Sequence, residues 1–492
     1  MKKKGKSEMV MKVLLVNPNN TLQTYVPLGL AYISAVLKQA GHETSAFDTR
    51  ISVKKSVEKD LGERMHSFKP DIVAISCREI DFDMGLRVAK VAKEYGAFVI
   101  AGGPYATAAP HELISFSDID AVCIGEAEDA FVELAERMRK GQNFYDVKNF
   151  WFKTQGKVVK NQVRPLRSDI DSLPFPDWDV FMRESDCFEP TFLSSRGCPF
   201  NCTYCINNLL QKIYAGKGKY IRFRKAENIL AEVKYCVEKY NVKTVNFVDD
   251  AFTVDKKRLK AFAEGYRREI GVPFTIITRA DMIDYPAFRM LKEAGCESVA
   301  MGVESGSDFI REKVMKRRMS RETIVNAFKA AHKAGLYTYA FNIIGSPHET
   351  EKTIWETIEL NKEIKPGGTQ ISIMAAFKGS DLYNLVKKKG WLRNAKFTGW
   401  FNESALKLPS ISRRKLEAYH KTFALYVYAP RYMYPFIHIL RKGFEYCPHP
   451  LRRAVGWPLV RLNQLYSVFR RMGFKRTAGF VIKRAGTVVK SK

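Results

Sequence analysis

The chain has 492 residues, a formal net charge of +29 and nine cysteines, with 46% hydrophobic and 27% charged residues. This length exceeds one ordinary hydrophobic core and predicts roughly two to four domains. The composition excludes a disordered or fibrous protein, and the lack of any run of about 20 apolar residues excludes a protein with several membrane spans. The basic N-terminal stretch does not resemble a secretory signal, and nine cysteines in this length exclude a disulfide scaffold.

Residues 1–145 alternate short apolar runs with amphipathic stretches. Strands are expected at 12–18, 44–48, 71–77, 98–102 and 121–125, and helices at 27–40, 52–67, 83–96 and 127–140. Strands separated by helices favour an α/β domain, a doubly wound parallel (Rossmann-like) sheet with helices on both faces. A mixed α+β domain is the alternative. Such sheets bind ligands beyond the carboxyl ends of their strands.

Residues 146–184 are expected to form a linker, because Pro174 and Pro176 interrupt any helix there. The strand–helix rhythm then returns in residues 185–400. Strands are expected at 191–195, 244–248, 274–278, 298–303, 337–344 and 370–376, and helices at 225–240, 255–270, 286–294, 320–334 and 350–364. Six such units predict a partial (β/α)6 barrel, whose chemistry gathers at the strand C-termini.

Three cysteines follow the first strand of this barrel. Cys198, Cys202 and Cys205 have the spacing C-x3-C-x2-C, which lets one loop bind three corners of a cubane iron–sulfur cluster. A zinc site is the alternative, but structural zinc normally takes four protein ligands. The loop has no histidine, and the next cysteine, Cys236, lies on an expected helix. The ligand set favours a cluster with one iron open to a substrate or cofactor.

The cysteine loop, with Tyr204 before its third cysteine, resembles the signature of radical S-adenosylmethionine (SAM) enzymes. Strings at the later strand ends extend the resemblance, at 248–252, 302–306, 342–349 and 375–377. The resemblance implies a [4Fe–4S] cluster held by the three cysteines, whose free iron chelates SAM. Reductive cleavage then yields a 5′-deoxyadenosyl radical, with electrons from a partner of the flavodoxin or ferredoxin type.

The resemblance also implies a set of SAM-binding residues. Asp249 and Asp250 correspond to polar groups that meet the methionine amino group, and Glu304 to an acidic residue near the ribose. The other members of the set are Tyr204, Asn342, Gly345, Glu349 and Phe377. The chain departs from the family at 345–349, where GSPHE replaces a glycine-leucine-proline-glycine-glutamate string, and at Lys378, which replaces a proline.

The N-terminal domain resembles the cobalamin-binding domain that is fused to this barrel in the anaerobic Mg-protoporphyrin cyclase and carbon methyltransferase subgroup. The resemblance lies in the strings at 25–30, 102–104 and 125–128. The residues expected to bind cobalamin are Pro27, Ser76, Gly102, Gly103, Gly125 and Glu126. The chain has no D-x-H-x-x-G string, so no histidine is evident as a lower cobalt ligand. A domain that serves only as a scaffold is the alternative.

The resemblance implies an enzyme that methylates an unactivated carbon of a hydrophobic or lipid-linked small molecule. Cobalamin-dependent oxidation or cyclisation is the alternative. A membrane- or RNA-binding adaptor with a degenerate core is a remote one, because all three cysteines and Glu304 are present. Methylthiolation of RNA would need a second cluster, and the N-terminal domain offers only Cys77 and Cys123 for it.

Residues 401–492 are expected to form a basic, mainly helical C-terminal extension. From 411 to 492 there are 18 Lys and Arg against 2 Asp and Glu, together with 14 aromatic residues. This composition favours a cytoplasmic enzyme that attaches peripherally to an anionic membrane face, with tyrosines and Trp457 at headgroup level. A helical cap on the barrel and a nucleic-acid-binding arm are the alternatives, since aromatic and basic residues also bind RNA.

Overall fold

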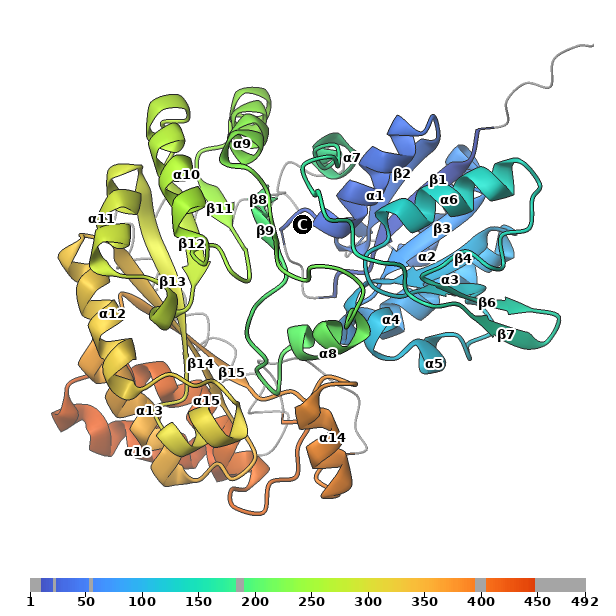
Figure 1. Cartoon of the computed structure of the whole chain (residues 1–492). Helices are drawn as coiled ribbons and strands as arrows, with labels where there is room; N and C mark the ends of the chain where they lie inside the picture. Colours follow the sequence, from blue (N-terminus) through green and yellow to red (C-terminus); the bar gives the residue numbers. More distant parts are fainter. Residues whose placement is uncertain (1–9, 21–23, 53–55, 183–189, 394–403, 447–492) are drawn as a thin grey trace, which may run out of the picture. The chain divides into compact units, whose positions relative to one another are not determined.

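A computed structural model describes residues 10–20, 24–52, 56–182, 190–393 and 404–446 (Figure 1). The chain divides into two compact units. The first comprises residues 1–191 and 209–224, and the second comprises residues 192–208 and 225–492. Each unit contains one α/β sheet, and each is described by itself below.

The first unit contains a sheet with the strand order β2-β1-β3-β4-β5-β6-β7. Its parallel strands are β1 (Lys12–Asn17), β2 (Glu43–Asp48), β3 (Ile72–Ser76), β4 (Phe98–Gly102) and β5 (Ala121–Cys123). Contacting helix pairs are α1 (Leu28–Gln39) with α6 (Glu128–Arg139), and α2 (Val57–Phe68) with α3 (Phe82–Glu94). Shorter helices are α4 (Gly103–Ala108), α5 (Pro110–Leu113) and α7 (Trp178–Met182). The expected doubly wound sheet is confirmed.

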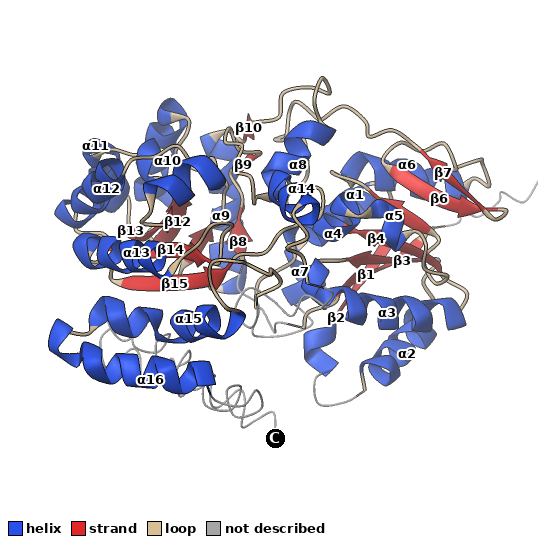
Figure 2. Ribbon diagram, turned by 90° about the horizontal axis from the view of Figure 1, so that it is seen from below, coloured by secondary structure: helices blue, strands red, loops and turns tan. Residues whose placement is uncertain are grey.

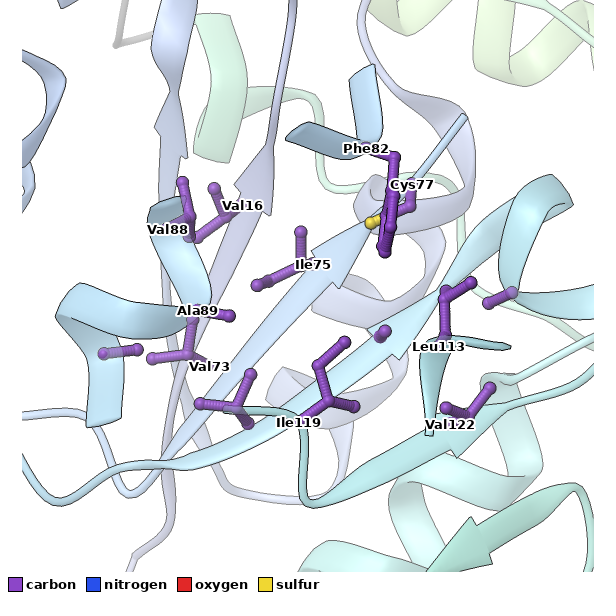
Figure 3. Close-up of a cluster of buried hydrophobic side chains, with 14 of the residues drawn as sticks. Val16, Val73, Ile75, Cys77, Phe82, Val88, Ala89, Leu113, Ile119 and Val122 are labelled. Atoms are coloured by element: carbon purple, nitrogen blue, oxygen red, sulfur yellow. The ribbon is translucent and has the colours of Figure 1, made fainter. Parts of the chain in front are cut away.

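Figure 3 shows the core of this unit on the α2–α3 face of the sheet. Alternate strand residues point into it, such as Val73 and Ile75 of β3, and meet Val88 and Ala89 of α3. The intervening strand positions are buried as well, because helices cover both faces of the sheet. This explains why the strands have continuous apolar sequences.

Residues 146–184, expected as a linker, contribute a hairpin to the sheet. β6 (Phe150–Thr154) pairs antiparallel with β5, and β7 (Lys157–Lys160) pairs antiparallel with β6. Phe150 and Phe152 are fully buried, whereas Trp151 and Lys153 are half-buried. Burial therefore follows the period-2 pattern of a strand. The proline-containing run lies beyond this hairpin.

The second unit contains a sheet with the order β15-β14-β13-β12-β11-β8, in which the pairs from β11 to β15 are parallel. The strands are β8 (Thr191–Phe192), β11 (Val245–Phe247), β12 (Phe274–Thr278), β13 (Cys296–Glu304), β14 (Tyr337–Ile344) and β15 (Gly368–Ile373). The helices between them are α9 (Ala226–Tyr240), α10 (Lys256–Glu269), α11 (Tyr285–Glu293), α12 (Arg321–Lys333) and α13 (Glu351–Ile364). This is the expected partial barrel.

Polar residues set the starts of several barrel helices. Asp255, Asp284, Ser320 and Thr350 each accept a hydrogen bond from a backbone N–H in the first turn of the following helix. Such caps satisfy donors that have no partner within the helix. They fix where each helix begins, and so the length of the loop between a strand end and its helix.

The C-terminal helices cover the last strand of the barrel (Figure 2). α15 (Arg413–Tyr428) packs against β15 and α13, and α16 (Tyr434–Tyr446) packs against α15. Leu416 and Phe423 of α15 join Ile373 in one buried cluster. Residues 413–428 therefore form a helical cap on the barrel, which is one of the alternatives for the C-terminal extension. Most of the surface of α15 is buried in this packing and is not available to a membrane. Residues 447–492, including Trp457, lie outside the described residues.

No helix among the described residues is long and apolar enough to cross a membrane.

Candidate functional site

The three cysteines lie on the loop between β9 (Ser195–Arg196) and α8 (Ile206–Ile213). All are free thiols; Cys202 is buried, and Cys198 and Cys205 are half-buried. Burial raises the pKa of the Cys198 thiol to about 12 and also raises the pKa of Cys205. Without a cofactor these two thiols are thus protonated, and iron would have to displace their protons.

Within the residues that the structure describes, no three His, Cys, Asp or Glu side chains form a group that could hold a single metal ion. Thiolates around one tetrahedral ion lie about 4 Å apart. A cubane cluster instead takes one cysteine at each of its corners. The described residues therefore offer no site for a single metal ion, and this says nothing about whether the three cysteines bind a cubane cluster.

Glu304 connects the cysteine loop to the end of β13. Its φ of 63° and a register shift between Gly302 and Glu304 form a bulge that redirects its side chain. The carboxylate is buried, accepts a hydrogen bond from the Tyr204 hydroxyl and lies 3.8 Å from Nη2 of buried Arg317. Burial raises the pKa of Glu304, while Arg317 and Tyr204 oppose the shift. Half-buried Tyr204 and buried Glu304 and Arg317 thus form one polar network.

Arg279, which follows β12, is held directly beside the cysteine loop. Its Nη1 lies 3.9 Å from Sγ of Cys202, and its guanidinium lies 3.5 Å from the ring centroid of Phe200. Asp281 accepts hydrogen bonds from Nε and Nη2 of Arg279 at 2.9 and 2.7 Å. A fixed positive charge therefore lies beside one of the three cluster ligands.

Asp249 and Asp250 follow β11 but have different environments. Oδ1 of Asp249 accepts hydrogen bonds from the Ser194 amide and hydroxyl at 2.8 Å each and from the Ser195 hydroxyl at 2.5 Å. Its Oδ2 is buried and has no hydrogen-bond partner among the described residues. Asp250 is exposed and accepts a hydrogen bond from Asn207 at 3.1 Å. The Asp249 carboxylate also interacts electrostatically with Arg258 of α10, and its Oδ2 has room for one further hydrogen bond from a donor such as a ligand amino group.

Asn342 does not point toward the other residues that are expected to bind SAM. Its amide exchanges hydrogen bonds with Asn361 of α13 and donates to Thr369 of β15, so its polar atoms are used on the helix side of the sheet. Side chains alternate along a strand, so Phe341 and Ile343 point to the opposite, interior face. Ile343 packs in the same cluster as Tyr204. The motif match alone could not show whether Asn342 or its neighbours Phe341 and Ile343 face the barrel interior.

The segment after β14 holds a buried hydroxyl without a partner in the described chain and the buried Glu349 carboxylate, which accepts hydrogen bonds from Thr353 and the Ser346 amide. Gly345 has a φ of 86°, and a Cβ there would lie 2.7 Å from Leu416 of α15. The hydroxyl of buried Ser346 has no partner among the described residues. Glu349 is buried, and burial raises its pKa to about 7. Phe377 follows β15 and accepts a backbone hydrogen bond from Ser380 at 3.0 Å.

In the first unit, the residues expected to bind cobalamin lie at strand ends or helix starts. Ser76 ends β3, Gly102 ends β4, and Pro27 precedes α1. Gly103 has a φ of 88°, and a Cβ there would lie 2.9 Å from Oγ of Ser76. This glycine therefore permits close packing between the β4–α4 turn and the end of β3.

Gly125 and Glu126 contact residues of the segment 209–224 instead of an open space. A Cβ on Gly125 would lie 1.9 Å from the Tyr214 hydroxyl, which accepts a hydrogen bond from the Glu126 amide at 2.7 Å. Both carboxylate oxygens of Glu126 accept hydrogen bonds from Arg222. Tyr214 and Arg222 could not be found from the sequence, because no local pattern relates them to β5.

Among the described residues, those expected to bind SAM have more buried, unused hydrogen-bonding atoms than those expected to bind cobalamin. In the barrel, the unpartnered Asp249 oxygen and Ser346 hydroxyl fit a ligand that carries amino and hydroxyl groups, as SAM does. In the first unit, Pro27, Ser76, Gly102 and Gly103 lie at strand ends or helix starts, where a cobalamin could be held. Gly125 and Glu126 are already engaged by Tyr214 and Arg222.

Two family models match the chain: the radical SAM superfamily over residues 192–360 and the B12 binding domain over residues 16–135. An uncharacterized methyltransferase of Pyrococcus horikoshii is 30% identical over 403 residues, which cover 78% of this chain and 86% of the relative. The anaerobic magnesium-protoporphyrin IX monomethyl ester cyclase of Rubrivivax gelatinosus is 25% identical, and the match covers 77% of this chain and 70% of the cyclase. The hopanoid C-3 methylase of Methylococcus capsulatus is 24% identical, with 77% and 73% covered.

Solved structures share the fold. The radical SAM methyltransferase TsrM of Kitasatospora setae, with cobalamin and a [4Fe–4S] cluster bound, has a TM-score of 0.66 at 17% identity, covering 83% of this chain and 84% of that one. The cobalamin-dependent radical enzyme OxsB has a TM-score of 0.69 at 14% identity, covering 98% and 75%. The two matched domains assign a [4Fe–4S] cluster, SAM and cobalamin as cofactors of this enzyme. The chain belongs to the radical SAM superfamily, in the group that joins a B12-binding domain to the radical SAM barrel.

Proposed function

We propose that this enzyme methylates an unactivated carbon of a hydrophobic or lipid-linked small molecule. The observation that carries the proposal is the three-cysteine loop whose Tyr204 hydrogen-bonds Glu304 at the end of β13. When bound, the cluster and SAM supply a radical that removes hydrogen, and cobalamin supplies the methyl group.

The chain's own residues position these groups in the proposal. Cys198, Cys202 and Cys205 hold the cluster, and no fourth cysteine follows in the loop. Oδ2 of Asp249 accepts a hydrogen bond from the amino group of SAM, because its other oxygen is already saturated by Ser194 and Ser195. Tyr204, Glu304 and Arg317 provide polar groups for the nucleoside part of SAM.

Two observations support an apolar substrate. Strand alternation directs Tyr339, Phe341 and Ile343 of β14 toward the barrel interior, where they are partly exposed. An aromatic and aliphatic lining of this kind favours an apolar ligand. The similarity to the hopanoid C-3 methylase, whose name denotes an apolar substrate, is compatible with this proposal. A one-electron donor of the flavodoxin or ferredoxin type would supply the reducing electron.

Radical oxidation or cyclisation is the second candidate, supported by the similarity to the anaerobic magnesium-protoporphyrin cyclase. The two candidates differ in the fate of the SAM methyl group. With methyl-labelled SAM and a chemical reductant, methylation puts the label into the product. An unlabelled product that has lost hydrogen would establish the second candidate instead.

The cluster assignment has a separate test. Anaerobic reconstitution of the wild-type chain should give about four irons per chain and the EPR signal of a reduced cubane. Cys202→Ala should lose most of both, whereas Cys236→Ala, a buried cysteine on α9, should keep them. Full iron content in the Cys202→Ala variant would overturn the assignment.

A further inference from the structure

Helix α16 buries one side and exposes large apolar residues on the other. Ile437, Arg441 and Phe444 are buried, and Arg441 lies over the Tyr419 ring of α15 at 4.5 Å. The opposite side carries Phe436 and Ile439, whose side chains are 71% and 70% exposed. A surface helix normally presents polar residues to water on the side away from the core. α16 is the outermost helix of this cap in Figure 2, with α15 between it and β15.

The exposed side chains form a continuous face. Phe436, Ile439 and Tyr446 follow one another at helical spacing, and Tyr432 and Met433 extend the row through the preceding turn η5 (Arg431–Met433). We name these five residues the α16 face. Tyr432, Tyr446, Phe436 and Ile439 are the most exposed large hydrophobic residues of the described chain. Their concentration on one short segment distinguishes them from the singly scattered apolar residues of ordinary protein surfaces.

Positive charge accompanies the α16 face. Arg431 and Lys442 are exposed beside it. Arg431 pairs with Glu359 at 3.0 Å, but both side chains are exposed, and such pairs contribute little. The 46 residues that follow α16, 447–492, contain 11 Lys and Arg and no Asp or Glu. An apolar face flanked by cations and continued by a basic segment is complementary to an anionic lipid surface.

We propose that the α16 face docks the enzyme onto an anionic lipid bilayer. Phe436, Ile439 and Met433 enter the interface, and Tyr432 and Tyr446 place their hydroxyls at headgroup level. Lipid suits this face better than RNA, because aliphatic side chains such as Ile439 cannot stack bases. The proposal does not depend on the proposed reaction, since it concerns only where the protein binds.

Vesicle co-sedimentation of the full-length chain tests this proposal. The vesicles contain phosphatidylglycerol and phosphatidylcholine, or phosphatidylcholine alone. Phe436→Gln/Ile439→Gln keeps helix propensity and charge but removes apolar area. It should lower the partition coefficient for anionic vesicles at least about tenfold. The matched control Tyr235→Gln/Leu385→Gln changes exposed apolar residues on α9 and α14 (Asp381–Lys388) and should bind as the wild type does.

Each other outcome overturns the proposal. Equal binding of Phe436→Gln/Ile439→Gln and wild type, with matching thermal unfolding, would remove the role of the face. Binding of the wild type to RNA but not to anionic vesicles would assign the cap to nucleic acid. A dimer in light scattering that the variant dissociates, without vesicle binding, would make a second copy the occupant. Iron content and methyl labelling are read without vesicles, so none of these results changes the proposed reaction.

Discussion

The Nη1 atom of Arg279 lies 3.9 Å from Sγ of Cys202, on a guanidinium that Asp281 and the Phe200 ring hold in place. Both residues belong to the barrel unit, but 77 positions separate them in the sequence. A cation next to a cluster ligand favours the more negative, reduced state of a cluster electrostatically.

We therefore expect Arg279→Gln to lower the midpoint potential of the reconstituted cluster, measured by EPR-monitored redox titration. Arg279→Lys keeps a charge and should shift the potential less. Arg289→Gln is the control, because Arg289 is exposed and pairs with Glu293 on its own helix. The same potential in Arg279→Gln and wild type would contradict the electrostatic role.

Two glycines near the end of β13 should respond differently to alanine. A Cβ at Gly306 would lie 2.1 Å from the backbone oxygen of Glu356, which cannot move without α13. A Cβ at Gly302 would lie 2.4 Å from Oε1 of Glu304 and 2.6 Å from Nη2 of Arg317, both ends of flexible side chains. Gly306→Ala should lower the free energy of unfolding by about 3 kcal/mol in urea titration. Gly302→Ala should unfold nearly as the wild type but bind SAM more weakly by calorimetry.

Glu349 should make the cofactor-free enzyme less stable as the pH rises. Burial raises its pKa to about 7, above the value of 4.5 expected in the unfolded chain. Between these values the folded state holds a proton that the unfolded state has lost, so stability falls as pH increases from about 4.5 to 7. Glu349→Gln should remove this component, which is on the order of 3 kcal/mol. Melting temperatures of both proteins from pH 5 to 8 check the prediction, and parallel curves would contradict it.

His420 should act in the opposite direction. Burial on α15 lowers its pKa to about 4, and its Nε2 lies 3.1 Å from the Ile371 carbonyl oxygen of β15. The unfolded chain binds the proton near pH 6.5, so stability is lost as pH falls from about 6.5 to 4. We expect His420→Gln to weaken this acid sensitivity in unfolding experiments. His66, which is exposed, provides the control His66→Gln.

The sequence predicted the features that depend on local pattern. The strands of both units have continuous or alternating apolar residues, and the cysteine spacing lies within one loop. Arg279 follows an expected strand, but its contact with Cys202 could not be predicted, because 77 positions separate the two residues. The contact of Arg317 with Glu304 likewise depends on the folded barrel and has no sequence motif. Asn342 illustrates a different limit. A shift of one residue reverses the face of a strand, so a motif match cannot fix which neighbour points inward.

The C-terminal extension shows that composition alone could not distinguish the parts of the tail. Residues 413–428 share the basic and aromatic composition of the whole extension, yet they supply Leu416 and Phe423 to the barrel core. Lys415 pairs with Glu351 at 2.6 Å, so part of the positive charge is used within the fold. The cluster of apolar residues on α15 could be assigned to the barrel only once β15 was known to end the sheet.

The position of α15 along β15 also bears on how the edge of this sheet is protected. β15 is the terminal strand of its sheet, and terminal strands carry backbone groups that can recruit a strand from another molecule. α15 lies over this strand, and His420 contacts one of its carbonyl oxygens. A chain shortened to residue 405 would lose that cover and would be prone to aggregate through β15. Pelleting of such a shortened chain would then report edge-to-edge association instead of affinity for lipid.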